Sequence, residues 1–220
     1  MYRKNKLDDI YFGPNKKSKA EKTETIVDNL NIKNNLSDLE KNDVKIERDN
    51  NHIYFYSEVD RESVFDLLAL IREAEEESLL TSFKLNIPEI PIYLHINSLG
   101  GAIYEALNAV DTILSSKIPI YTIIEGATAS AGTLISIVGK KRFIRPNAHM
   151  LIHQLSASCW GKMDEIDDQY QNYENLMIRV KKMYQKYCDI PKKELDNILK
   201  HDLWFDSDKC LKYKLVDEIW

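Results

Sequence analysis

Two turns, each joining an apolar strand-like run to an apolar helix-like run, constrain the fold of this chain most strongly. The first run, residues 91–96, is followed by a turn that contains Gly101, and the second run, residues 118–124, by a turn that contains Ser130. Turns of this kind occur where the parallel strands of a sheet lead into helices. Because backbone N–H groups are exposed where a helix begins, the sequence predicts two sets of N–H donors with one serine between them.

The alternation of strand-like and helix-like patterns predicts an α/β fold. Residues 52–56 are β-branched and aromatic, as in a strand, whereas Val64, Leu67 and Ile71 recur at helical spacing. Strand and helix then alternate through the two turns, which predicts one parallel sheet covered by helices. Residues 81–89, which include a proline, are expected to form a loop between the first helix and the second strand.

The first 51 residues differ in composition from the rest of the chain. They are rich in Lys, Asn, Asp and Glu and contain few aromatic side chains. Such a segment buries too little apolar surface to offset the entropy of ordering the chain. We therefore predict a polar, mobile extension over residues 1–51 and a single domain over residues 52–220.

Three residues at the ends of apolar runs could form an activated serine. In chain order they are Ser130, His153 and Asp202. A serine hydroxyl needs a base to remove its proton, and the base needs a third group to orient it. The backbone N–H groups of Gly101 and Ala131, at the two turns, would then stabilise a negatively charged oxygen. This combination predicts a serine hydrolase.

Each of these residues also has a simpler interpretation. Ser130 could cap a helix, His153 could be an ordinary core residue, and Asp202 could pair with Lys200. Their joint placement beside two turns is what favours catalysis. The elbow of the α/β-hydrolases does not fit, because that motif needs a glycine where this chain has Thr128.

Composition and charge argue against several classes of function. The net charge of −5 disfavours a general nucleic-acid-binding protein, since phosphate contacts need a clustered basic face. No apolar run is long enough to cross a membrane, and no secretory signal is expected. The three cysteines lack metal-ligand spacing. We therefore expect free thiols, a cytoplasmic location, and neither a metal nor a cofactor.

Five segments, taken together, resemble those of one family. They are residues 96–101 (INSLGG), 126–132 (GATASAG), 142–147 (RFIRPN), 152–154 (IHQ) and 202–205 (DLWF). Their order and approximate spacing are similar to those of the proteolytic subunit of the ATP-dependent Clp protease (ClpP). The resemblance runs from about residue 52 to residue 220.

This resemblance implies a fold, a chemistry and an assembly. The implied fold is the ClpP/crotonase-like ββα superhelix, in a single α/β domain. The implied nucleophile is Ser130, with His153 as the base and Asp202 as its orienting residue. Gly101 and Ala131 would form the oxyanion hole. The implied activity is cleavage of unfolded polypeptides inside homo-oligomeric, heptameric rings that an ATP-dependent AAA+ unfoldase supplies.

The resemblance also implies a docking surface for the unfoldase. Matching the motifs assigns this surface to eight residues: Tyr93, His95, Ser115, Ile123, Glu125, Phe143, Arg145 and Trp220. Half of these side chains are polar or charged, where the family is largely apolar. Glu125 and Arg145 would weaken the binding of an apolar unfoldase loop, unless they pair with each other or with a complementary partner. We therefore expect a non-standard partner.

Two other functions stay open. A crotonase-like acyl-CoA enzyme would share the oxyanion hole, and a structural or regulatory ring subunit would share the assembly. Neither needs the complete Ser–His–Asp set that this chain carries. For the assembly, we expect aromatic side chains of a long helix beginning at Met163 to be covered in a ring. These are Tyr170, Tyr173, Tyr184 and Tyr187.

Overall fold

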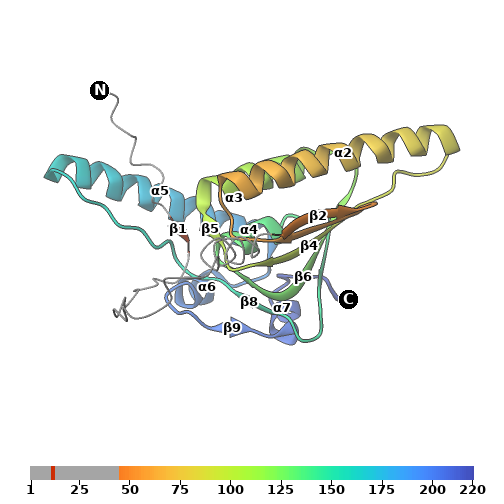
Figure 1. Ribbon diagram of the computed structural model, residues 1–220. Coiled ribbons are helices and arrows are strands. Elements are labelled where there is room, and N and C mark those ends of the chain that lie inside the picture. Colours follow the sequence, from red (N-terminus) through yellow and green to blue (C-terminus); the bar gives the residue numbers. More distant parts are fainter. Residues whose placement is uncertain (1–10, 13–44) are drawn as a thin grey trace, which may run out of the picture.

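The computed structural model describes residues 11–12 and 45–220, and an eight-stranded sheet forms its centre (Figure 1). The strands of this sheet are β2 (Lys45–Asp49), β3 (His52–Tyr56), β4 (Ile92–Ser98), β6 (Ile120–Ala129), β7 (Lys141–Ile144), β8 (His149–Leu151), β9 (Trp204–Phe205) and β10 (Glu218–Ile219). A separate two-stranded sheet pairs β1 (Tyr11–Phe12) with β5 (Gly101–Ala102).

The large sheet is mostly parallel. Its strand order is β10-β7-β6-β4-β3-β2. From β3 to β10 along this order, neighbouring strands are parallel, whereas β2 is antiparallel to β3. β8 continues the sheet beside the end of β6, in parallel, and pairs with β9 in antiparallel. The predicted α/β domain with a parallel sheet is confirmed.

The helices confirm most of the predicted pattern and correct one boundary. They are α2 (Arg61–Leu85), α3 (Ile103–Ser115), α4 (Ala131–Ser136), α5 (Met163–Tyr187), α6 (Lys192–Ile198) and α7 (Ser207–Lys212). The Asp60 side chain caps α2 by accepting a hydrogen bond from the Ser63 N–H. The prediction of a loop from residue 81 is wrong, because residues 81–85 lack proline and glycine and continue the helix. Asn86, in the left-handed conformation, ends α2 two residues before Pro88.

Alternation along β3 separates the core from a second face of the sheet. Ile53 and Phe55 are fully buried, whereas His52, Tyr54 and Tyr56 are partly buried. The buried face packs against helices that contribute Val64, Leu67, Leu68 and Ile71 from α2 and Ala106, Ala109 and Val110 from α3. Each large apolar side chain buried here contributes roughly 1.5–3 kcal/mol of stability.

Ordered structure includes residues on the N-terminal side of the expected domain boundary. β2 forms a hairpin with β3, in which Arg48 lies opposite Ile53. The Arg48 guanidinium also pairs with the Glu77 carboxylate on α2. The predicted mobility of the extension falls on residues 1–10 and 13–44, which lie outside the described residues. The division of the chain at residue 52 stays a prediction.

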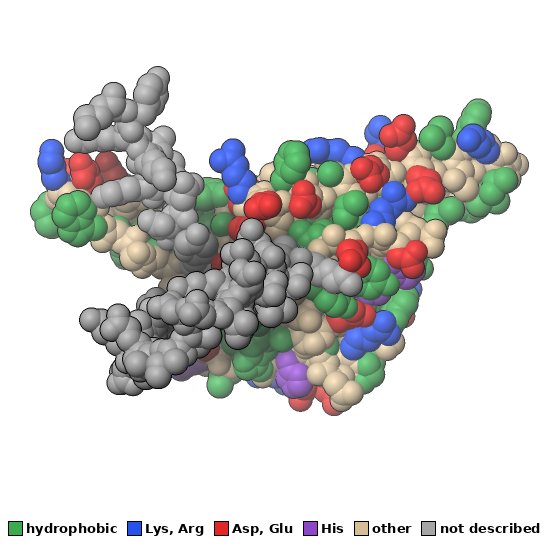
Figure 2. Space-filling view, viewed as in Figure 1, with side chains coloured by type: hydrophobic (Ala, Val, Ile, Leu, Met, Phe, Trp, Pro, Cys, Tyr) green, Lys and Arg blue, Asp and Glu red, His purple; other side chains and the backbone are tan. Residues whose placement is uncertain are grey.

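Two long helices, α2 and α5, project beyond the sheet (Figure 1). The C-terminal part of α2 extends past the sheet on one side, and the N-terminal part of α5 extends past it on the other. Apolar side chains gather on the projecting end of α2 (Figure 2). Leu80, Phe83 and Leu85 are exposed there, Phe83 by 88%. Met163 and Tyr170 are exposed on α5. Exposed apolar clusters of this kind indicate surfaces that contact another molecule.

Two expectations about the chain as a whole can be compared with the structure. Cys159, Cys188 and Cys210 are free thiols, as predicted. In the described ranges, no helix has both the length and the apolar character that crossing a membrane requires.

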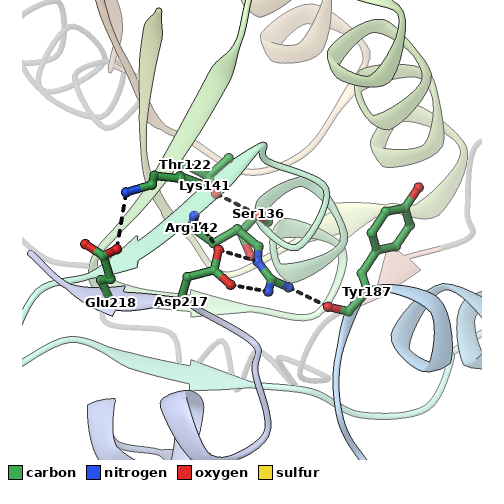
Figure 3. Close-up of polar contacts among 7 residues, drawn as sticks. All are labelled: Thr122, Ser136, Lys141, Arg142, Tyr187, Asp217 and Glu218. Atoms are coloured by element: carbon green, nitrogen blue, oxygen red, sulfur yellow. Dashed lines mark hydrogen bonds and ion pairs between the residues drawn. The ribbon is translucent and has the colours of Figure 1, made fainter.

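Arg142 holds the C-terminal segment against the sheet (Figure 3). Its guanidinium donates to both carboxylate oxygens of Asp217, at 2.5 and 3.0 Å, and to the carbonyl oxygen of Tyr187, at 2.5 Å. Burial acts to raise the pKa of Asp217, but the hydrogen bonds from Arg142 outweigh it and lower that pKa. This contact keeps β10 beside β7 and so brings Trp220 onto the sheet.

Candidate active site

Ser130 occupies the turn between β6 and α4 and is fully buried. Its backbone has φ 57° and ψ −126°, a conformation that residues with a Cβ rarely adopt. Its side chain makes no hydrogen bond that caps α4, so the interpretation of Ser130 as an ordinary helix cap is wrong. The Ser130 N–H donates to the Leu151 carbonyl at 2.8 Å, which anchors the turn to β8. Strain at one buried polar residue is typical of functional sites.

The register of three strands brings His153 and Asp202 to this turn. β8 runs parallel to β6, so the residues that follow these two strands leave the sheet side by side. β8 also pairs with β9 in antiparallel, with Leu151 opposite Trp204. Extending this register by two residues along each chain places His153 opposite Asp202. A hydrogen bond of 2.7 Å from the Gln154 N–H to the end of α6 holds the two segments together.

The three side chains form a continuous hydrogen-bonded chain. His153 Nε2 lies 2.9 Å from Ser130 Oγ, and His153 Nδ1 lies 2.9 Å from Asp202 Oδ1. Because a carboxylate can only accept, the proton of the neutral imidazole lies on Nδ1. Nε2 can then accept the hydroxyl proton of Ser130. The structure brings together all three residues predicted from the sequence.

The three hydrogen-bonded side chains differ sharply in how deeply they are buried. Ser130 and His153 are buried, whereas 71% of the Asp202 side chain is exposed. Water therefore screens the contact between His153 and Asp202, which contributes only about 0–1 kcal/mol to stability. The value of Asp202 to the site lies in orienting the imidazole ring rather than in holding the fold together.

The backbone of Gly101, the first of the two residues predicted to donate N–H groups, has a conformation that favours glycine. Its φ is 147°, and a Cβ at this position would collide with the carbonyl oxygen of Val59. Ala102 N–H donates to that same carbonyl at 2.6 Å. Since successive N–H groups of an extended chain point to opposite sides, the Gly101 N–H points away from Val59. Ala131 is the first residue of α4, so its N–H has no acceptor within the helix.

A buried tyrosine that the sequence analysis did not assign to the site supports the Ser130 turn. The Tyr184 hydroxyl on α5 lies 2.6 Å from Thr133 Oγ1, which donates to the Ser130 carbonyl oxygen at 2.6 Å. Tyr184 is completely buried, so the expectation that it would be open for contacts in a ring is wrong. Tyr170, on the same helix, is exposed as expected. Helical spacing alone could not tell which tyrosine faces α4.

Seven of the eight residues expected to form the docking surface lie on one face of the sheet. They are Tyr93, His95, Ile123, Glu125, Phe143, Arg145 and Trp220, and we call them the aromatic face. The Trp220 ring lies 5.6 Å from that of Tyr93 and 4.9 Å from that of Phe143. Arg145 lies over the Trp220 ring at 5.7 Å. The eighth residue, Ser115, lies instead at the end of α3.

Glu125 is the polar centre of the aromatic face. Its carboxylate accepts hydrogen bonds from Arg145 Nε at 2.9 Å, from His95 Nδ1 at 3.0 Å and from the Tyr56 hydroxyl. Burial acts to raise the pKa of Glu125, but these hydrogen bonds outweigh it and lower that pKa. Burial lowers the pKa of His95 despite the neighbouring carboxylate, so this ring is neutral at neutral pH. Glu125 and Arg145 thus pair with each other.

Two residues of β3, His52 and Tyr56, join this hydrogen-bonded network and were not predicted from the sequence. His52 Nδ1 lies 2.9 Å from His95 Nε2, and the His52 ring stacks on Tyr93 at 4.8 Å. Burial, together with the Glu125 carboxylate, raises the pKa of Tyr56. The alternation along β3 could have placed both residues on one face. It could not have shown that β4 is the neighbouring strand. Within the described residues, no group of side chains has a metal-binding arrangement.

Known proteins with similar sequences belong to one family. The model of the Clp protease family matches residues 46–220. The ATP-dependent Clp protease proteolytic subunit of Streptococcus mutans is 38% identical over 133 residues, which cover 58% of this chain and 67% of that protein. The subunit of Deinococcus radiodurans is 31% identical over 134 residues, which cover 60% of this chain and 66% of that protein.

A third relative extends the match along the chain. The ATP-dependent Clp protease proteolytic subunit of Leuconostoc citreum is 31% identical over 166 residues, covering 70% of this chain and 82% of that protein. The matches to the first two relatives span about two thirds of their length. The family match includes all but the first residue of the large sheet, from β2 to β10. The chain therefore belongs to the Clp protease family, and its single α/β domain has the fold of that family.

Proposed function

We propose that this protein is a serine endopeptidase that hydrolyses peptide bonds of unfolded polypeptides. The observation that carries the proposal is the chain of two 2.9 Å contacts from Ser130 through His153 to Asp202. Membership of the Clp protease family supports the same reaction, since its matched relatives are named as proteolytic subunits. The proposed catalytic residues are Ser130, His153 and Asp202.

The reaction proceeds through an ester on Ser130. His153 Nε2 accepts the hydroxyl proton while Ser130 Oγ bonds to the carbonyl carbon of the substrate. Asp202 stabilises the imidazolium, which returns the proton to the leaving amine as the C–N bond breaks. His153 then takes a proton from a water molecule, and the resulting hydroxide attacks the ester. The carboxylate product leaves, and Ser130 regains its proton.

Two backbone N–H groups stabilise the oxygen that becomes negatively charged. We assign them to Gly101, whose N–H points away from Val59, and to Ala131, whose N–H has no partner within α4. One such donor contributes about 3 kcal/mol to the stability of the transition state. The left-handed backbone of Ser130 turns the chain sharply here, so that α4 begins beside its hydroxyl.

In our proposal, the enzyme works in the cytoplasm as a ring of subunits. An ATP-dependent AAA+ unfoldase supplies its substrates. The exposed apolar ends of α2 and α5 support an assembly, because Phe83 and Met163 would otherwise stay in water. The family supports homo-oligomeric, heptameric rings with an ATPase partner. Ring formation would confine hydrolysis to chains that have already been unfolded.

The unfoldase that docks on the aromatic face is a dedicated one rather than a general bacterial Clp unfoldase. Glu125 and Arg145 pair with each other at the centre of this face, so neither charge is left unpaired, but the Arg145 side chain is still 42% exposed to water. An apolar loop that docks here would remove water from this pair, at a cost of a few kcal/mol. A loop with complementary charge would avoid that cost.

Labelling of the serine tests the catalytic assignment directly. A fluorophosphonate probe should modify Ser130, as read by peptide mass mapping, and should leave Ser130→Ala unlabelled. Ser115→Ala is the matched control, because Ser115 is exposed on α3, and it should be labelled like the wild type. Unstructured peptides should be cleaved by the wild type and not by Ser130→Ala. Turnover of acyl-CoA without peptide cleavage would instead indicate a crotonase-like enzyme, and no turnover of either would indicate a regulatory ring subunit.

A further inference from the structure

A short segment near the N-terminus lies on the strand that carries a proposed oxyanion donor. β1 pairs in antiparallel with β5, with Phe12 opposite Gly101 and Tyr11 opposite Ala102. Figure 1 shows β1 next to β5, which leads directly into α3. β5 is only two residues long, and β1 is its partner in this sheet. This edge of β5 can therefore bind an extended peptide by backbone pairing.

The hydrogen bonds of β5 show which of its groups face β1. Val59 N–H donates to the Gly100 carbonyl at 2.8 Å, and Ala102 N–H donates to the Val59 carbonyl at 2.6 Å. Both bonds lie on the side of Val59. The N–H and C=O of Gly101 point to the other side, where β1 lies. The residue paired with Gly101 is Phe12, so the backbone of Phe12 faces the proposed oxyanion donor.

This edge adjoins the nucleophile. α4, which begins directly after Ser130, packs against β5 and β4. Gly132, in its first turn, lies so close to β4 that a Cβ there would come within 3.1 Å of the Ser98 carbonyl oxygen. An extended peptide that pairs with β5 therefore lies near α4. A substrate of the proposed peptidase needs this same course, because its reacting carbonyl must meet both N–H donors.

We propose that the segment containing Tyr11 and Phe12 is a cis-acting occupant of the peptide-binding edge of β5, with which polypeptide substrates must compete. Competition with substrates depends on the proposed function, whereas the position of this segment on β5 follows from the register of β1 and β5. The segment belongs to the same chain, so its effective concentration at β5 is in the millimolar range. Even a weakly pairing segment then blocks the edge for a substantial part of the time.

Proline substitution removes the pairing without changing the catalytic residues. Phe12→Pro lacks the N–H that an antiparallel partner of Gly101 donates, and proline disfavours a paired strand. Lys6→Pro is the matched control, since it introduces proline into the extension outside β1. A variant that lacks residues 1–16 tests the same idea independently of proline. Neither change touches the core, which lies in residues 53–216.

Peptide binding measured without catalysis tests the inference. All variants carry Ser130→Ala, and the probe is a short fluorescein-labelled unstructured peptide followed by anisotropy. We expect Phe12→Pro and the truncated chain to bind it about threefold or more tightly than the parent, and Lys6→Pro to bind as the parent does. A synthetic peptide with the sequence of residues 8–16, added in trans, should compete with the probe. Equal affinity for all variants would overturn the inference.

Hydrogen exchange provides a second readout that separates this inference from the proposed function. Backbone amides in the peptide that contains Gly101 should exchange faster in Phe12→Pro than in Lys6→Pro, because the pairing partner is lost. Faster exchange and tighter binding in a protein that cleaves no peptide would leave the inference standing and overturn the proposed function. Unchanged exchange and binding in a protein that does cleave peptides would overturn the inference alone.

Discussion

The Tyr184 hydroxyl on α5 lies 2.6 Å from Thr133 Oγ1 on α4. Thr133 in turn donates to the carbonyl oxygen of Ser130, so this pair supports the strained turn from behind. Burial raises the pKa of Tyr184, which keeps its hydroxyl protonated at any physiological pH. The last turn of α5 and the first turn of α4 are thereby fixed relative to each other, although they are far apart in the sequence.

Loss of this hydroxyl should weaken the fold and, to a smaller degree, the reaction. Tyr184→Phe keeps the buried ring but leaves the Thr133 hydroxyl with one hydrogen bond fewer, which costs about 1 kcal/mol. We expect Tm to fall by about 2–4 °C in thermal unfolding followed by circular dichroism. kcat should fall less than in variants of the three catalytic residues, with KM unchanged. Tyr170→Phe, on the exposed part of the same helix, is the control. A Tm equal to that of the wild type would show that the contact is unimportant.

Asp202 should matter for catalysis although it is exposed. Asp202→Asn can donate to His153 Nδ1 and so favours the tautomer that has its proton on Nε2, where it cannot accept from Ser130. We expect kcat for a fluorogenic peptide to fall by about 10⁴-fold, with little change in stability. Asp196→Asn is the control, because Asp196 pairs with Lys181 of α5 at the surface. A decrease of less than tenfold would remove Asp202 from the proposed mechanism.

An apolar replacement of the ion pair on the aromatic face should change the choice of unfoldase. Wild-type protein should show weak or no degradation of a folded, tagged substrate with a general bacterial Clp unfoldase and ATP. Glu125→Met combined with Arg145→Leu removes both charges and should increase this degradation, because no ion pair then loses water on docking. Lys181→Leu combined with Asp196→Met removes a surface pair elsewhere and should have no effect. Robust degradation that is the same in the wild type and the first double variant would contradict the argument.

The contact between Arg142 and Asp217 should make stability depend on pH. The folded-state pKa of Asp217 is lowered, so its contribution is present above the unfolded-state pKa of about 3.8 and is lost as pH falls through the folded-state value. Asp217→Asn should therefore lower the free energy of unfolding by about 1–2 kcal/mol at pH 7 and by less below pH 4.

Urea unfolding of the wild type and Asp217→Asn at pH 7 and at pH 3 measures this difference in the free energy of unfolding. Asp208→Asn, on α7, is the control variant and should show no comparable dependence on pH. A loss of stability in Asp217→Asn that is the same at pH 7 and at pH 3 would mean that the carboxylate charge is not what stabilises the C-terminal segment.

Exposed apolar side chains at the projecting end of α2 should be needed for assembly. Sedimentation at micromolar concentration should show a ring, most simply of seven subunits, for the wild type. Phe83→Ser combined with Leu85→Ser should shift the protein toward smaller species, because it removes apolar surface that the ring would bury. Lys84→Ser, between these positions, is the control. A wild-type protein that sediments as a monomer while it cleaves peptides would contradict the proposed assembly.

The order of elements and the candidate catalytic residues followed from local pattern. Apolar runs that lead into the turns at Gly101 and Ser130 predict strands followed by helices, and β4 and β6 begin close to where those runs begin, although β6 continues to Ala129. Ser130, His153 and Asp202 each follow an apolar element closely, which is why they could be selected before any contact was known. The prediction that α2 stops near residue 81 failed, because Pro88 marks where a helix cannot continue but not where it ends.

Only the tertiary structure decided which segments that are distant in the sequence contact each other. Local periodicity depends on neighbours within a few residues, so it cannot show that Tyr184 faces Thr133, that His52 stacks on Tyr93, or that Phe12 lies opposite Gly101. Those pairings depend on strand order and register, which are settled by how the whole chain buries its apolar surface. The sequence thus determined the chemistry available in this protein, while the assembled sheet determined which of its side chains meet.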